Sequence, residues 1–306
     1  MLVCLATACQ NDDPAPAGPS GSDSEPADDS VAMPGRSPES LPGGLQALDS
    51  QECLLVQERD PLNNVVLQRI RYRAQSGIPR GISFSDGSRD TFILKDNQLR
   101  IERIQANQLL AASSIYQLDP ESFRVVRLQE RDSTGRLVLE TSYRYTEGGF
   151  LEAQTTFFFG YDAQGQRDTL ARERETRDLA FGRMESAERR IIFKTTDQDT
   201  DTTFTRLTYD YVQGDYQLRN FQAAALRTLL GLNGKPARLR VRAIWEERRD
   251  AEQENYALER LTRYQYGLDS SQGLINSVLI EQLEVDSLGK LQQTALQESR
   301  FDYRCR

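Results

Sequence analysis

Residues 238–245, with the sequence RLRVRAIW, alternate basic and apolar side chains over most of their length. A period of two places the apolar side chains on one face of a β-strand and the charged ones on the other. Residues 69–73 and 141–145 show the same alternation, and residues 53–56 and 301–305 are expected to form the first and last strands. Strands of this kind build antiparallel sheets that have one buried face and one solvated face.

Three short turns between these segments share the pattern Asp-x-x-Gly, at residues 132–135, 162–165 and 286–289. Asp favours the first position of a type I turn, and Gly suits the following position, where φ is positive, so each turn is expected to close a hairpin with a bulge. The sequence therefore predicts an all-β antiparallel meander of hairpins, forming a large twisted sheet or a sandwich, over residues 51–306.

One segment, residues 220–234, interrupts the strand pattern. Asn220 is a good N-cap, Phe221, Ala225 and Leu229 lie on one helical stripe, and the segment ends at Asn-Gly. We expect one short helix there, packed over a face of the sheet.

The tyrosines and turns together carry a resemblance. Residues 161–165, with the sequence YDAQG, and the tyrosine pairs 143/145, 209/211 and 264/266 resemble the YD-type β-hairpin repeats of Bacteroidota lipoproteins. The resemblance implies repeated hairpins over residues 127–306. The alternative is a generic antiparallel protein that uses the same turn chemistry.

The first fourteen residues carry a second resemblance. Small residues precede Cys9, and Gln-Asn-Asp-Asp follows it, which resembles a bacterial lipoprotein processing site. The resemblance implies that residues 1–8 are the remnant of a signal peptide and that Cys9 carries the lipid. The acidic pair Asp12-Asp13 is similar to the surface-export signal of Bacteroidota lipoproteins, implying an outer-membrane anchor that faces outside; the alternative is an acidic segment that only keeps the tether soluble. A short apolar leader ending at a chance cysteine is the alternative.

Residues 9–50 are expected to form a disordered acidic tether, because they contain too few large apolar side chains to offset the entropy of ordering. Residues 10–50 hold eight acidic side chains and one basic one, whereas residues 51–306 hold 38 acidic and 37 basic ones. The negative charge of the chain thus belongs to the tether. The near-neutral remainder excludes general nucleic-acid binding, which needs an excess of Lys and Arg.

Cys53 and Cys305 lie at the two ends of the all-β region. In an oxidising compartment we expect them to form a disulfide that closes nearly the whole domain. Two separate buried thiols are the alternative, because sequence does not establish proximity.

The chain contains no histidine, which removes Ser-His-Asp and Cys-His machinery and most zinc sites. No Gly-rich phosphate loop is present, and no cofactor is expected. Asp197, Asp199 and Asp201 have the spacing of a calcium loop, but Thr202 stands where that loop needs glycine, so we expect no metal.

Carboxylates in the strands are interleaved with arginines, as at Glu173, Glu175, Glu246 and Glu247, which predicts cross-strand ion pairs on a solvated face. The alternative is a glycosidase-like enzyme that uses two such carboxylates. The tyrosine pairs either stack on sugar rings or pack the core. The sequence favours a lipid-anchored, non-enzymatic binding or structural module whose candidate partners are a glycan or an envelope protein.

Overall fold

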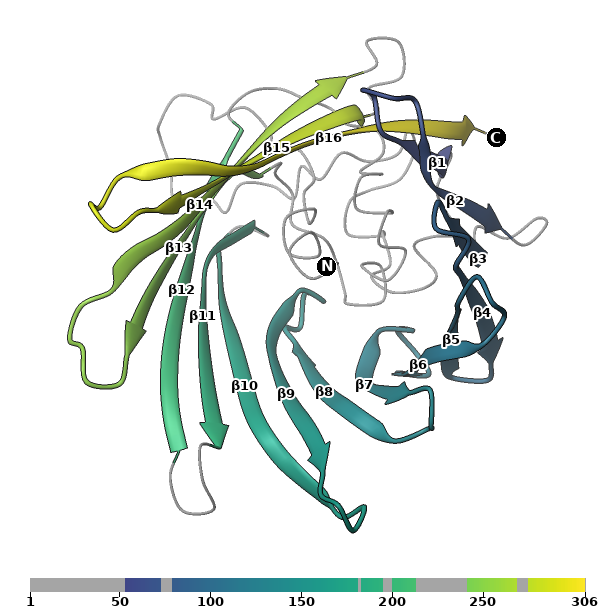
Figure 1. The fold of residues 1–306 in the computed structure, drawn as a ribbon, viewed down its shortest axis with the longest axis horizontal. Helices are drawn as coiled ribbons and strands as arrows, with labels where there is room; N and C mark the ends of the chain where they lie inside the picture. Colours follow the sequence, from purple (N-terminus) through teal and green to yellow (C-terminus); the bar gives the residue numbers. More distant parts are fainter. Residues whose placement is uncertain are drawn as a thin grey trace.

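The computed structural model describes residues 53–72, 79–180, 183–194, 200–212, 241–268 and 275–305. These residues form a closed antiparallel β-barrel in which every strand pairs with its neighbours in chain order (Figure 1). Within the described ranges no helix is long and apolar enough to cross a membrane.

The strands lengthen along the chain, so the second half of the barrel wall is taller than the first. They are β1 (Cys53–Arg59), β2 (Val66–Tyr72), β3 (Pro79–Phe84), β4 (Arg89–Lys95), β5 (Gln98–Ile104), β6 (Leu110–Leu118), β7 (Val125–Asp132), β8 (Leu137–Tyr145), β9 (Leu151–Tyr161), β10 (Arg167–Ala180), β11 (Arg183–Lys194), β12 (Thr200–Tyr211), β13 (Val241–Asp250), β14 (Ala257–Leu268), β15 (Ile275–Val285) and β16 (Leu291–Cys305).

The predicted architecture is wrong, because the strands close into a barrel of 16 strands and form neither an open sheet nor a sandwich. β1 pairs with β16, and Figure 1 shows the two ends of the chain's sheet side by side. Closure removes the two edges, whose unpaired backbone groups would otherwise remain open to other strands. The described residues contain no helix, and the helix predicted at residues 220–234 lies outside them.

The three predicted Asp-x-x-Gly turns are confirmed. Gly135, Gly165 and Gly289 have φ values of 83°, 79° and 76°. In each turn the glycine N–H donates to the carbonyl of the aspartate at 3.0 Å. The aspartate Oδ1 also accepts two backbone N–H groups, which in the first turn belong to Thr134 and Arg136, both at 2.9 Å. Local side-chain chemistry therefore determines these turns.

The register separates two faces of the wall, which alternate along every strand. The inner face carries the buried core; one of its rows runs Leu99, Tyr116, Leu128, Thr141, Thr156, Glu173, Ile191 and Thr203 from β5 to β12. The adjacent outer row runs Gln98, Gln117, Arg127, Ser142, Thr155, Arg174, Arg190, Phe204 and Arg249. None of the outer-row residues is buried.

Six tyrosines at or near strand ends fasten neighbouring strands together. Each hydroxyl donates to a carbonyl near the start of the preceding strand; the pairs are Tyr72 with Leu55, Tyr145 with Val125, Tyr161 with Leu137, Tyr211 with Met184, Tyr266 with Val241 and Tyr303 with Ile275. In the predicted tyrosine pairs, the other members, Tyr143, Tyr209 and Tyr264, belong to the core or pack against it. The tyrosine pairs are therefore built into the wall, as the core-packing alternative expected.

Candidate functional site

The outer wall of the barrel is charged at mid-height, on strands that are long enough to cross a membrane as part of a barrel. Arg174, Arg206 and Arg263 lie near the middles of β10, β12 and β14. The large apolar side chains that are exposed are scattered over many strands and turns, such as Leu62, Leu170 and Leu288. A lipid-facing barrel instead carries a continuous apolar band about 25 Å tall.

Cross-strand ion pairs cover this outer wall. Arg127 donates to Glu140 at 2.6 Å between β7 and β8, and Arg263 lies 3.3 Å from Glu281 between β14 and β15. Arg242 pairs with Asp210 in the same way. Each pair is partly exposed, which reduces its contribution to stability to about 0–1 kcal/mol. These pairs balance part of the charge of the outer wall locally.

The inner face carries a buried charge cluster on β10 and β11. Glu175 is 1% exposed, and it accepts from Arg177 Nε at 2.8 Å and from Arg189 Nη2 at 3.0 Å. Arg189 Nε also lies 3.2 Å from Glu173. The predicted cross-strand ion pairing of Glu173 and Glu175 is therefore present, through Arg189, but it lies on the inner wall and not on a solvated face.

The pKa values of Glu175 and Glu173 are shifted in opposite directions. Burial raises the pKa of Glu175, but the positive charges of Arg177 and Arg189 outweigh it and hold that pKa below its usual range. Burial raises the pKa of Glu173, which Arg189 only partly opposes. The pair is nevertheless unlike that of a glycosidase, whose carboxyl groups flank a bond from two sides of a cleft. Here they are neighbours on one strand face and share one arginine.

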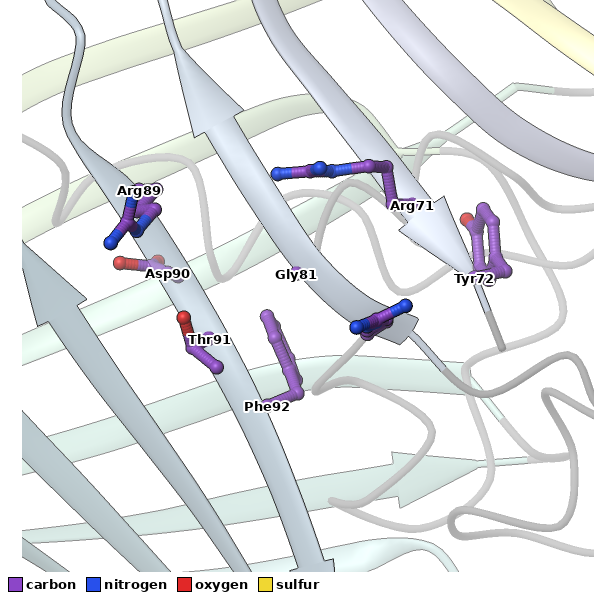
Figure 2. A pocket seen from close by; sticks show the side chains of 8 residues that line it. Arg71, Tyr72, Gly81, Arg89, Asp90, Thr91 and Phe92 are labelled. Atoms are coloured by element: carbon purple, nitrogen blue, oxygen red, sulfur yellow. The ribbon is translucent and has the colours of Figure 1, made fainter. Parts of the chain in front are cut away.

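A groove of about 700 Å³ lies at β2, β3 and β4. Its lining includes Arg71, Arg80, Arg89, Thr91 and Gly81. Figure 2 shows the Arg71 side chain extending from β2 across β3, towards the part of β4 where Arg89 and Thr91 lie. We call this feature the arginine groove.

Gly81 keeps the middle of the arginine groove open. It pairs with Arg71 on one side and with Thr91 on the other, so it lies on the same wall face as both. A Cβ atom at this position would come within 2.7 Å of the backbone oxygen of Asp90, so no larger residue fits without a backbone shift. Asp90 itself is held by Arg103 through two bonds of 2.7 Å.

The arginine groove was not predicted from the sequence, although the sequence contains a signal for it. Residues 61–84 contain four arginines and no aspartate or glutamate. In a chain that otherwise interleaves the two charges, an acid-free basic stretch predicts arginines that lack intramolecular partners.

A second groove, of about 540 Å³, lies at β12, β13 and β14. Its lining includes Trp245, which is half-buried, together with Arg242 and Arg263. Both arginines are already paired, with Asp210 and Glu281 respectively. Its charges are therefore satisfied from within the chain, unlike those of the arginine groove.

The remaining predicted sites fall partly outside the described residues. Cys9 and the centre of the acidic hairpin tip, residues 195–199, lie outside them. Within the described ranges no cluster of three or more metal-ligating side chains occurs. Cys53 and Cys305 are direct register partners where β1 meets β16. Opposite residues of an antiparallel pair have Cα atoms about 4.5–5.5 Å apart, within the range of disulfides.

Comparison with known proteins finds the same fold elsewhere. A porin-like protein from Bacteroides vulgatus ATCC 8482 superposes with a TM-score of 0.50 and 11% identity, over 82% of this chain and 98% of that chain. A porin-like protein from Bacteroides uniformis ATCC 8492 gives a TM-score of 0.46 and 15% identity, over 78% and 89% of the two chains. No family model and no curated protein matches the sequence. At these identities the likeness concerns the fold alone.

Proposed function

We propose that this chain is a lipid-tethered β-barrel that stands in water at the surface of the outer membrane, where it acts as a non-enzymatic binding or structural module. In this proposal the barrel does not span the bilayer, and the anchor is the lipid on Cys9. Residues 10–50, with their acidic composition, separate the barrel from the anchor.

The observation that carries the proposal is the charged outer wall. An arginine on the lipid face of a barrel costs about 2–4 kcal/mol at the bilayer midplane. Arg174, Arg206 and Arg263, near the middles of their strands, would together cost about 6–12 kcal/mol in lipid. That penalty is comparable to the entire net stability of an ordinary domain, about 5–15 kcal/mol. In water the same residues cost little.

A non-enzymatic role is supported by the way the strand carboxylates are used. Glu175 is fully engaged by two arginines, and Glu246 lies 3.4 Å from Arg260. Both act as counter-ions within the wall. The Cys53–Cys305 disulfide also belongs to this proposal, and their direct pairing at the seam between β1 and β16 supports it.

Fractionation of cells that express the full chain and its Cys9→Ala variant tests the proposal. The wild type should sediment with the outer membrane and incorporate a radiolabelled lipid precursor, whereas Cys9→Ala should carry no label and should be soluble without detergent. A variant that stays in the membrane pellet and needs detergent for extraction would show that the barrel itself inserts. A variant that keeps the lipid label would refute Cys9 as the anchor.

A further inference from the structure

We propose that the arginine groove binds an acidic sugar, meaning a sugar ring that carries a sulfate or carboxylate group. The inference rests on the proposed function, because Arg71, Gly81 and Thr91 lie on the outer wall, which binds ligands only if it faces water. It adds a ligand class and a location to that proposal.

The first argument is the unbalanced charge. Arg71, Arg80 and Arg89 line one groove, and among the described residues none of them has a carboxylate within 4.0 Å. Arg71 donates only a long bond of 3.4 Å to the Ser83 hydroxyl. Asp90, the one acidic residue in the lining, lies next to Thr91 and so faces the other side of the wall, where it is held by the Arg103 fork.

The second argument is the contrast with the rest of the outer wall. Arg127, Arg206 and Arg263 each lie beside a glutamate of a neighbouring strand. Among the described residues, Arg174 and Arg190 have no such carboxylate either, but they line neither of the two grooves, whereas Arg71, Arg80 and Arg89 lie together around one hollow. Guanidinium groups match carboxylate and sulfate oxygens with paired N–H donors. An external oxyanion would therefore supply the missing counter-charge.

The third argument is the size and lining of the groove. A volume of about 700 Å³ lies within the range of about 300–1,000 Å³ typical of small-molecule sites, and it is far larger than a single ion needs. Thr91 provides a hydroxyl beside the three arginines. Charged and hydroxyl donors around a hollow of this size suit a sugar ring that carries an acidic group. The near-neutral charge of residues 51–306 argues against a long nucleic acid.

The test is calorimetric titration of the purified full chain with sulfated lactose, with unmodified lactose as the matched neutral sugar. We expect the sulfated sugar to bind at least tenfold more tightly than lactose. The double variant Arg71→Ala/Arg89→Ala should weaken binding of the sulfated sugar by a further factor of at least about ten, because charge-assisted hydrogen bonds are lost. Arg174→Ala removes one exposed arginine from the outer wall of β10 and should change the affinity less than twofold.

Competition experiments separate the sugar from other sources of oxyanion. Inorganic sulfate at equal concentration should not displace the sulfated sugar, and vesicles of phosphatidylglycerol should not bind the chain. Displacement by inorganic sulfate, binding to vesicles alone, or an affinity that is the same in the double variant would each overturn the proposal. If the double variant does not fold, Arg71→Lys keeps the charge, loses the planar fork, and should still weaken binding.

The two proposals fail separately. Arginine-independent binding would remove the sugar assignment and would leave the water-facing barrel intact. Retention of the Cys9→Ala variant in the membrane would contradict the proposed function, whatever the titration shows.

Discussion

Substitution of Glu175 by glutamine removes the negative centre of the inner charge cluster. Glu175 is 1% exposed and Arg177 is 6% exposed, and they are joined by a bond of 2.8 Å. The substitution would remove the negative charge that Arg177 contacts at 2.8 Å in a buried site, whereas Arg189 would keep Glu173 at 3.2 Å. Breaking a buried pair by removing one partner costs about 3–5 kcal/mol. Because Arg189 keeps Glu173, we expect a loss at the lower end of this range, about 3 kcal/mol.

Urea unfolding monitored by circular dichroism measures this loss. Glu188→Gln is the matched control, because Glu188 is 60% exposed on the outer wall and lies 3.7 Å from Arg206; it should cost less than about 1 kcal/mol. The Glu175→Gln/Arg177→Gln double variant should cost less than the sum of the single variants, since both single variants lose the same Glu175–Arg177 interaction. Equal losses for Glu175→Gln and Glu188→Gln would refute the argument.

The cluster also predicts how stability depends on pH. The pKa of Glu175 in the folded state lies below its usual value, chiefly because the charges of Arg177 and Arg189 outweigh the effect of burial. The contribution of Glu175 to folding stability is therefore fully present above pH 4.5, the ordinary pKa of a glutamate. It is lost as the pH falls through the lower pKa of the folded state. Glu175→Gln should consequently flatten the acid side of the stability curve. An unchanged acid side would contradict the sign of this shift.

Three further outcomes are expected. Burial raises the pKa of Glu130, so ionised Glu130 destabilises the folded state once the pH rises above the ordinary pKa of a glutamate. Glu130→Gln should therefore raise the urea midpoint more at pH 8 than at pH 4. An equal change at both pH values would contradict this prediction. Gly165→Ala should cost about 1–2 kcal/mol, because φ is 79° and an added Cβ meets nothing within 4 Å, whereas Gln164→Ala in the same turn should be nearly neutral in the same urea assay. Cys53→Ser and Cys305→Ser should each lower stability equally, by up to about 5 kcal/mol under non-reducing conditions; reaction of both wild-type thiols with maleimide in denaturant without reductant would refute the disulfide.

The sequence predicted best the features that depend on neighbouring residues. The Asp-x-x-Gly turns need only an acceptor at Asp132 and a positive φ at Gly135, and both properties belong to the residues themselves. Closure of the barrel depends on β1 meeting β16 after the whole chain has turned. No local pattern encodes that meeting, so a long meander predicts an open sheet equally well.

The two wall faces were harder to predict because both of them contain charge. On β10, Arg172 and Arg174 alternate with Glu173 and Glu175, so a period of two separates two faces without showing which is buried. The two faces can be told apart only with β11 in place. Glu175 lies opposite Arg189 on the buried face, whereas Arg174 lies opposite Arg190 on the exposed face. The chemistry of a strand therefore establishes the alternation, and its neighbours determine which side faces the core.

The same dependence on neighbours explains why the arginine groove was missed and why it merits the first experiment. Arg71, Arg80 and Arg89 are separate in sequence and come together only because β2, β3 and β4 are adjacent in the barrel. Wherever the wall brings an arginine beside a glutamate, charge is balanced within the chain, as at Arg127 and Glu140. At the arginine groove the same packing brings cations together beside a glycine. Since the chain supplies no free carboxylate there among its described residues, a ligand with an oxyanion is the partner that this part of the wall is built to accept.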